Sequence, residues 1–515
     1  MTAHMTLAQE KYHSKSHSLR VAAALGASAG AIVLRGTSTT LWSDCDQYVP
    51  FRQARYFYYL TGCDEPDCAL LYDIESRRVI LFIPPRDDHA AIWSGPTITP
   101  EQAYARYEID NVLEMEDLDE VVAQWMDAHP RDTLFVHPCE QFTAERFACR
   151  VDSTSLLPAM DACRAIKTPQ EIRLLQQANA VSAAAHTAVL RVISSLTNET
   201  EVEAAFLFAC IATGAKHQAY GVIAASGANA ATLHYGRNDE PLAGRQLLLL
   251  DAGAEYKLYA SDVTRTFPIS GHLSTEAGEI YGLVQAMQES CIARLRPGGA
   301  FVDLQVLAHA IAVEGLLKLG ILRGERAAVL RAGVSLVFFP HGLGHHVGLD
   351  VHDVIAGVPL MGATSDSKRM EHARARDTGD VRDTTSSAMT DAGPHESVFS
   401  DSFLADDPDL VDHLRSMLVP PRASSLLKTR LAAGMVVTVE PGIYFSRVAL
   451  RAAFADGRGR YIDGSVLGRY MGVGGVRIED DIVITATGYD NITTAPKGEA
   501  ALRIIREGGR CEEAV

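Results

Sequence analysis

Five side chains beyond residue 250 have the chemical types that a hydrolytic metal centre needs. They lie in strand-like or glycine-rich segments and are Asp251, Asp262, His345, Glu440 and Glu479. Four carboxylates and one imidazole are mostly hard oxygen ligands, which suit manganese, magnesium or a hydrolytic zinc or cobalt pair better than a structural thiolate zinc. These residue types indicate a catalytic centre for two divalent ions.

Each acidic residue also has an alternative, purely structural explanation. An aspartate after a strand is commonly a turn or cap residue, and a glutamate at a strand end is usually solvated. Glu440 and Glu479, however, follow β-branched apolar runs, where burial without a cation or partner is costly or forces the group neutral. The joint occurrence of the acids therefore favours metal binding.

Further histidines surround this set. Residues 340–346 read Pro-His-Gly-Leu-Gly-His-His, which is too rich in glycine for a helix and differs from the helical HExxH motif of single-zinc proteases. A lone histidine there would usually be structural, but His341 and His352 lie on either side of His345. They indicate ligand and proton-handling roles, and His234 is a fourth candidate.

This combination of groups suits the hydrolysis of an amide bond. Two neighbouring cations can share a water, lower its pKa and polarise a carbonyl oxygen. Glu440 could accept the proton of that water and pass it on, while His341 or His352 could stabilise the oxyanion or donate to the leaving nitrogen.

Strand-like runs must position the carboxylates. The run 246–250 ends at Asp251, and 259–267 is expected to be a second strand with Asp262 on the same face as its threonines. The run 436–440 ends at Glu440, and alternation over 475–479 places Arg477 and Glu479 on one face. We therefore expect one strand-built cavity lined by all four acids.

The length of 515 residues predicts two domains. Short strand-like runs at 31–34, 69–72, 79–83 and 133–136 alternate with helical ones, which indicates an α/β N-terminal domain. Thr168 and Pro169 then open a long amphipathic helix to residue 195, and a second helix at 199–214 and a strand at 220–225 follow. We expect an N-terminal domain over 1–165, a catalytic domain over 166–505 and a tail over 506–515.

One segment interrupts the catalytic domain. Residues 363–406 are rich in Ser, Thr, Asp and Arg and have almost no apolar periodicity, so we expect a disordered surface loop. An added lid and a translated intron are the alternatives. A short helix over 407–417 would follow it, and the segment affects substrate access more than the ligand set.

Composition excludes several classes. A net charge of −17 argues against electrostatic capture of nucleic acid or of an anionic membrane. The apolar stretch 21–34 is shorter than the roughly 20 residues that span a bilayer, and it is too rich in Ala and Gly and begins too late for a typical signal peptide. Nine cysteines without a CxxC spacing predict reduced thiols and a cytoplasmic location.

Five short segments carry a resemblance to a known family. Residues 251–253, 261–268, 341–346, 439–442 and 476–480 resemble the metallopeptidases with the pita-bread fold, above all aminopeptidase P and prolidase of the fungal type. Residues 51–62 and 164–169 extend the resemblance over nearly the whole chain. It implies an α/β (α+β) protein with a pita-bread catalytic domain preceded by a smaller, creatinase-like α/β domain.

The resemblance also implies roles for individual residues. Asp251, Asp262, His345, Glu440 and Glu479 would ligate two divalent ions, most commonly Mn²⁺, with Asp262 and Glu479 bridging. The residues implied around the substrate are Tyr220, His234, His341, His352 and Arg477. His346 matches a variable position and is not expected to be a ligand. A homo-oligomer, dimer or tetramer, is also implied.

The implied activity is removal of the N-terminal residue from peptides whose second residue is proline. An Xaa-Pro dipeptidase (prolidase) would use the same five ligands and is the first alternative. A metal-free hydrolase such as creatinase, or a non-enzymatic binding protein on the same fold, would lack most of the ligands that this sequence retains. Proline-containing peptides are therefore the expected partners.

Overall fold

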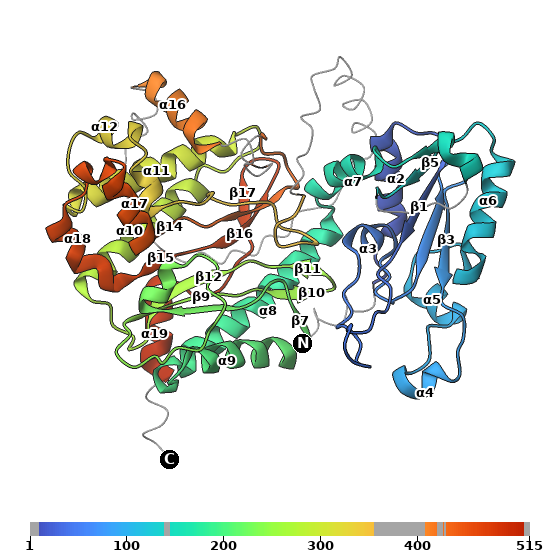
Figure 1. Ribbon diagram of the computed structural model, residues 1–515, viewed down its shortest axis with the longest axis horizontal. Coiled ribbons are helices and arrows are strands. Elements are labelled where there is room, and N and C mark those ends of the chain that lie inside the picture. The colour runs from blue at the N-terminus through green and yellow to red at the C-terminus, as the bar shows by residue number, and fades with distance from the viewer. Residues whose placement is uncertain (1–9, 139–144, 355–406, 420–425, 427–428, 509–515) are drawn as a thin grey trace, which may run out of the picture.

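The computed structural model describes residues 10–138, 145–354, 407–419, 426 and 429–508. Two α/β regions lie beside one another, the N-terminal one built on a single sheet and the C-terminal one on several small sheets (Figure 1). The long helix α8 (Pro169–Val192) begins where the first region ends and runs along the second. A mixed α/β architecture, as expected, is confirmed.

The N-terminal sheet has six strands in the order β4-β3-β2-β1-β5-β6. Their bounds are β1 (Ala31–Arg35), β2 (Ala69–Asp73), β3 (Arg78–Ile83), β4 (Asn111–Glu114), β5 (Leu134–Val136) and β6 (Val151–Asp152). β1 pairs antiparallel with β2 and parallel with β5, so the sheet is mixed. The four strands expected from sequence in this region are confirmed.

Helices cover both faces of this sheet. α2 (Ser14–Leu25), α3 (Arg55–Thr61) and α7 (Leu156–Ala165) contribute to one apolar core, and α6 (Leu118–Ala128) contributes to a second. Two smaller helices are α4 (Ala90–Ser94) and α5 (Pro100–Arg106). The strands alternate their side chains between the two cores, as a sheet covered on both faces requires.

The helix predicted after Thr168 is confirmed. The Thr168 hydroxyl accepts from the Glu171 amide while the Glu171 carboxylate accepts from the Thr168 amide, which is a capping box with Pro169 in the first turn. The α-helix ends at Val192, and residues Ile193–Ser195 form a 3-10 turn instead of a further α-turn. α9 (Glu199–Ala212) then packs against α8.

The C-terminal region holds four small sheets, with strand orders β12-β9-β8, β11-β10-β7, β13-β16-β17 and β14-β15. The strands are β7 (His217–Gln218), β8 (Ile223–Ser226), β9 (Leu247–Asp251), β10 (Ala254–Tyr256), β11 (Tyr259–Ala260), β12 (Thr264–Pro268), β13 (Val436–Val439), β14 (Gly442–Tyr444), β15 (Gly475–Arg477), β16 (Asp480–Ile484) and β17 (Tyr489–Asn491).

Three strand predictions need correction. The expected strand 259–267 is broken into β11 and β12, because the Asp262 amide donates to the Asp481 carboxylate rather than to a neighbouring strand. The expected strand 220–225 begins only at Ile223, so Tyr220 lies before it. Glu440 directly follows β13 instead of ending it, and Glu479 lies in the two-residue connection between β15 and β16.

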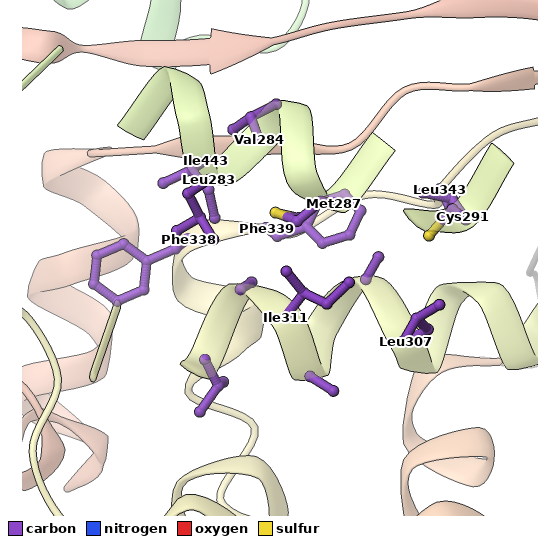
Figure 2. Packing of buried hydrophobic residues seen from close by; sticks show 14 of the residues in the cluster. Leu283, Val284, Met287, Cys291, Leu307, Ile311, Phe338, Phe339, Leu343 and Ile443 are labelled. Carbon is purple, nitrogen blue, oxygen red and sulfur yellow. The ribbon is translucent and has the colours of Figure 1, made fainter. Parts of the chain in front are cut away.

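Two buried helices support the histidine segment. Leu283, Val284 and Met287 of α10 (Thr275–Ile292) face Leu307 and Ile311 of α11 (Phe301–Lys318). Figure 2 shows this core together with Phe338, Phe339 and Leu343, which lead into the glycine-rich segment. The packing thereby fixes the chain just before His345.

The remaining α-helices among the described residues are shorter than α10 and α11. They are α12 (Arg326–Arg331), α13 (Ser335–Phe338), α16 (Pro408–Leu418), α17 (Arg447–Ala455), α18 (Gly464–Tyr470) and α19 (Gly498–Gly508). α16 confirms the short helix expected at 407–417, with Asp407 as its cap. The expected loop 363–406 lies outside the described residues. Among the helices that are described, none combines the length and the apolar character needed to span a bilayer.

Candidate metal centre

The five predicted ligands meet in one place. Possible ligand atoms lie within 4.8 Å of one another in three overlapping groups, which are Asp251–Asp262–Glu479, His345–Glu440–Glu479 and Asp262–His345–His352. The first two groups together contain all five predicted ligands. Asp262, His345 and Glu479 each belong to two groups, so two cations could share ligands there.

Antiparallel pairing brings the two aspartates together. Asp251 at the end of β9 pairs with Thr264 at the start of β12, and Asp262 lies just before β12. A Cβ atom on Gly253 would lie 1.9 Å from the Ser261 carbonyl oxygen, so only glycine allows the two segments to approach this closely.

Glu479 connects this hairpin to the second group of strands. Its backbone amide donates to the Thr264 carbonyl at 3.1 Å, and its Oε2 accepts from the Thr264 hydroxyl at 2.6 Å. β13 and β16 pair so that Val439 lies opposite Asp480, which sets Glu440 and Glu479 side by side. The carboxylates of two sheets therefore face one cavity.

The His345 ring is oriented by its backbone and by its second nitrogen. The His345 carbonyl accepts from the Thr438 amide at 2.9 Å, and the His345 amide donates to the Thr438 hydroxyl at 3.1 Å. Nδ1 lies 3.0 Å from the His346 carbonyl oxygen. Nε2 is left facing the acids, 3.3 Å from Asp262 Oδ2 and 3.4 Å from Glu440 Oε1, as a metal-ligating imidazole requires.

The acids strongly perturb one another. Burial and the neighbouring acids raise the pKa of Glu479 well above its usual range, and burial raises the pKa of Glu440 to about 7 against the opposing effect of His345. Burial would lower the pKa of His345, but contact with Asp262 and the charge of Glu440 raise it to about 9. A concentration of negative charge of this kind is stabilised by bound cations.

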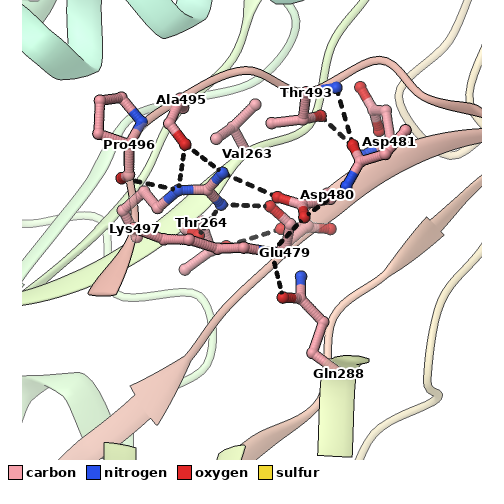
Figure 3. A network of polar contacts seen from close by, with 12 residues as sticks. Val263, Thr264, Gln288, Glu479, Asp480, Asp481, Thr493, Ala495, Pro496 and Lys497 are labelled. Atoms are coloured by element: carbon pink, nitrogen blue, oxygen red, sulfur yellow. Dashed lines mark hydrogen bonds and ion pairs between the residues drawn. The ribbon is translucent and has the colours of Figure 1, made fainter. Parts of the chain in front are cut away.

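The adjacent acids Asp480 and Glu479 differ in their hydrogen-bond partners, and this difference tests whether the donor set fits a metal. The Asp480 carboxylate accepts from Arg265 at 2.8 Å and from Lys497 at 2.6 Å, a network drawn in Figure 3. Glu479, which is 1% exposed, keeps its Oε1 without a hydrogen-bond partner in the described structure. An unpaired buried carboxylate oxygen among three further acids fits divalent cations.

The predicted substrate residues line the same cavity, whose volume is about 1010 Å³. They are Tyr220, His234, His341, His352 and Arg477. The Tyr220 hydroxyl donates to Asp251 Oδ1 at 2.6 Å, and the His352 ring lies 4.1 Å from that of His345. His346 is buried and belongs to none of the three possible ligand groups among the described residues.

The surroundings of two of these imidazoles favour the neutral form, although His352 is exposed and His341 only half-buried. Burial and Arg477 lower the pKa of His341 to about 3, and burial and His345 lower that of His352 to about 4. A neutral imidazole has one donor and one acceptor nitrogen. His352 can therefore receive or give a hydrogen bond to a substrate, whereas Nδ1 of His341 already lies 2.9 Å from the Gly342 carbonyl oxygen.

Sequence reasoning missed Tyr444. Its buried hydroxyl lies 2.8 Å from His341 Nε2 and accepts from Arg477 Nη1 at 2.9 Å, so it couples two of the cavity residues. Only its position, four residues after Glu440 and beyond a Pro-Gly turn, could have pointed to it. A tyrosine in a short apolar strand otherwise looks like a core residue.

Comparisons with known proteins agree with this geometry. The sequence profile of metallopeptidase family M24 matches residues 173–375 and 407–486, and that of the aminopeptidase P N-terminal domain matches residues 15–135. A probable Xaa-Pro aminopeptidase of Aspergillus clavatus is 47% identical over 97% of this chain and 94% of its own length. A probable Xaa-Pro aminopeptidase of Aspergillus niger is 44% identical over 96% of this chain and 92% of its own length.

Solved structures show the same architecture. Aminopeptidase P of Escherichia coli with the inhibitor Pro-Leu has a TM-score of 0.72 and 25% identity, covering 97% of this chain and 100% of that one. A zinc-substituted form of that enzyme in complex with product gives a TM-score of 0.69 at 26% identity, with 97% of this chain and 99% of that one covered. The chain therefore belongs to metallopeptidase family M24 and combines its pita-bread catalytic domain with the N-terminal domain of aminopeptidase P.

Proposed function

We propose that this protein is an Xaa-Pro aminopeptidase, which removes the N-terminal residue from peptides whose second residue is proline. The observation that carries the proposal is the cluster of Asp251, Asp262, His345, Glu440 and Glu479 at the wall of a cavity lined by neutral imidazoles. The names of the relatives that match nearly the whole chain support the substrate class.

The five clustered residues would hold two divalent ions, and we propose Mn²⁺ because the donors are mostly hard oxygens. Such ions supply Lewis acidity toward a carbonyl oxygen and a lowered pKa of coordinated water. Asp262 and Glu479 are the proposed bridging ligands, since each belongs to two of the ligand groups and, unlike His345, offers two carboxylate oxygens.

Glu440 is the proposed general base. Burial raises the pKa of its carboxyl to about 7 in the metal-free chain, so its surroundings favour the uptake of a proton. Its Oε2 lies 3.8 Å from His341 Nδ1 and its Oε1 lies 3.4 Å from His345 Nε2. A proton taken up at Glu440 stays beside the reacting bond until the leaving nitrogen accepts it.

The imidazoles and the arginine suit a bond that precedes proline. The proline ring removes the backbone N–H and fixes φ, so recognition by extended backbone hydrogen bonds is weakened. His341, His352 and His234 instead offer ring faces and single donors around the cavity. The proline nitrogen leaves as a ring amine and needs a proton, which Glu440 can deliver after it has taken one from the attacking water.

A side-by-side assay tests the proposal. The protein with Mn²⁺ is given an Xaa-Pro dipeptide and an Xaa-Pro-Yaa tripeptide, with Glu440→Gln as the matched control. We expect faster hydrolysis of the tripeptide and a loss of about 10²- to 10⁴-fold in kcat for the variant. Equal rates for the wild type and Glu440→Gln would refute the mechanism, whereas activity on the dipeptide alone would identify the prolidase alternative.

We further propose a cytoplasmic homo-oligomer, a dimer or tetramer. The cytoplasmic location is supported by nine cysteines without a CxxC spacing.

Association into an oligomer is supported by apolar side chains on the N-terminal region, since Ile92 and Trp93 of α4 are 77% and 80% exposed. Light scattering coupled to size exclusion tests the oligomer, and a monomer would refute it. Fluorescent tagging tests the location, and fluorescence of the tagged protein in the culture medium would refute it.

A further inference from the structure

The loop at residues 347–354 presents His352 to the metal centre. The rings of His352 and His345 pack at 61°, and His352 shares a possible ligand group with Asp262. Apart from this ring contact, no hydrogen bond from a described residue holds the His352 ring. The loop backbone must therefore set the position of this imidazole.

Two aspartates, Asp350 and Asp353, lie on either side of His352. Arg164 of the N-terminal domain forms ion pairs with both of them. Nη2 of Arg164, at the end of α7, donates to Asp350 Oδ2 at 2.8 Å and also to Asp353 Oδ1. Nζ of Lys167, in the connection to α8, donates to Asp353 Oδ2 at 3.0 Å. The two residues between the aspartates, one of which is His352, have little freedom while both ends are fixed.

These contacts are shielded from water. The side chains of Arg164 and Asp353 are 3% and 1% exposed, so their attraction is screened far less than that of a surface pair. The Asp353 amide also donates to the His346 carbonyl at 2.9 Å, which folds the loop back beside His345. A charged contact in the N-terminal domain is thus connected to the histidine ligand through one short stretch of backbone.

Packing alone does not hold the outer side of the loop. A cavity of about 400 Å³ lies there, lined among others by Tyr56, Arg164 and His352. Arg55 contributes a weaker contact to Asp350 at 3.4 Å and a stronger one to Glu255 at 2.7 Å. Ion pairs therefore connect the N-terminal domain to the outer side of this loop, in addition to the apolar packing of Val347 and Leu349 in a core shared with that domain.

We propose that Arg164 is a positioning residue of the hydrolytic site. By holding Asp350 and Asp353 together it sets the His352 imidazole against His345 and the substrate cavity. The N-terminal domain thereby tunes the reaction through a residue that belongs to none of the ligand groups. This inference rests on the proposed function, because it assigns His352 a role in that reaction.

A double-mutant cycle tests the coupling. We expect Arg164→Gln to lower kcat on an Xaa-Pro-Yaa peptide by about 10- to 100-fold, as the loss of residues that orient a metal site does, and Arg164→Lys to restore part of it. In a His352→Ala background the same change should cost less than about 2-fold. Equal losses in both backgrounds would overturn the proposal, because a purely structural role predicts that result.

Two matched variants guard against misfolding and unspecific charge effects. Asp350→Asn removes one side of the contact at a carboxylate that is 45% exposed, and we expect a smaller loss in the same direction with no change in melting temperature. Arg106→Gln removes an exposed pair with Glu65 in the same domain and should leave kcat unchanged. A wild-type kcat for Asp350→Asn would count against the proposal.

A spectroscopic measurement separates this proposal from the proposed function. In protein labelled with ¹⁵N-histidine and loaded with diamagnetic Zn²⁺, the His352 ring signals, assigned with His352→Ala, should shift in Arg164→Gln and stay in place in Arg106→Gln. Unshifted signals in Arg164→Gln would overturn the positioning role. A wild type without peptidase activity would refute the proposed function, while the spectra would still decide about Arg164.

Discussion

Nη2 of Arg477 lies 2.5 Å from Oδ2 of Asp251. The same guanidinium donates to the hydroxyls of Thr264, at 3.1 Å, and Tyr444, at 2.9 Å. One carboxylate of the metal centre thus has a cationic partner within the chain, whereas Glu479 retains an unpaired oxygen. Arg477 orients the Asp251 carboxylate. The negative charge of the other carboxylates of the centre is available to bind cations.

Arg477→Lys should lower kcat/KM by at least about 10-fold although it retains the charge. Lysine cannot direct donors to three partners at once as the planar guanidinium does, and each hydrogen bond to a charged group contributes about 1.5–3 kcal/mol. Steady-state kinetics on a tripeptide measures the effect. Arg469→Lys, at an exposed pair with Glu276, is the control, and an unchanged kcat/KM for Arg477→Lys would contradict the orienting role.

Gly344→Ala should abolish tight metal binding. A Cβ atom at residue 344 would lie 2.0 Å from the Thr438 carbonyl oxygen, so the His345 segment would have to move away from β13. Gly342→Ala provides the control two residues earlier, because the nearest atom to its Cβ is 3.8 Å away. Calorimetric titration with Mn²⁺ compares the two, and equal affinities would show that the close approach does not matter.

Glu479→Gln should reduce the stabilisation that metal provides. In chelator the variant should melt at or above the wild-type temperature, since the buried acid with a raised pKa is replaced by a neutral group. With Mn²⁺ the wild type should gain about 2.7 kcal/mol at a hundredfold excess over Kd, and the variant less. Thermal melts with and without Mn²⁺ measure this difference, and an equal shift in both proteins would exclude Glu479 as a ligand.

Thr168→Ala should lower the free energy of unfolding by about 1 kcal/mol, because it removes the side-chain cap of α8. Thr168→Ser keeps a hydroxyl and should stay close to the wild type. Urea unfolding followed by circular dichroism distinguishes them. Identical losses for alanine and serine would mean that the methyl group of Thr168, and not its hydrogen bond, stabilises the helix start.

Acid should destabilise the fold in part through His186. Burial and Arg265 lower the pKa of this imidazole from 6.5 to about 3, so below pH 6.5 the unfolded chain binds a proton that the folded chain does not. Stability is therefore retained above pH 6.5 and falls by about 1.4 kcal/mol per pH unit toward pH 3 for this group.

His186→Leu should make this decline shallower, even though the variant loses the ring contact with the Ala252 carbonyl. Urea unfolding at pH 7, 6 and 5 gives the slope for each protein. His413→Gln, at an exposed position on α16, should keep the wild-type slope. A wild-type slope in His186→Leu would assign the acid sensitivity to other groups.

Local patterns predicted the parts of this fold that depend on neighbouring residues. The apolar run 79–83 packs as part of β3, and Thr168 with Glu171 forms the expected cap. The prediction of one continuous strand was wrong at residues 261–263. There the Asp262 amide donates a hydrogen bond to the carboxylate of Asp481, a residue far along the chain. Backbone breaks of this kind depend on a distant partner, which periodicity cannot reveal.

At the candidate site, too, the sequence predicted some residues, whereas others could be recognised only from the structure. Residue types and glycine-rich surroundings pointed to the four acids and one histidine that converge, because carboxylates after apolar runs are unusual. Tyr444 and the contact between Arg164 and Asp353 were not foreseen, since a tyrosine in a strand and charges in loops are common. Only their positions in space give them a role.

The metal centre draws its carboxylates from segments far apart in the sequence. More than 200 residues separate Asp251 from Glu479. On a ribosome that adds ~5–20 residues per second, roughly 10 to 50 s pass between the synthesis of the first ligand and the last. During this interval the nascent chain contains Asp251 and Asp262 but not Glu479, so the carboxylates present repel one another. Binding of the cations is therefore one of the last steps in the synthesis and folding of the enzyme.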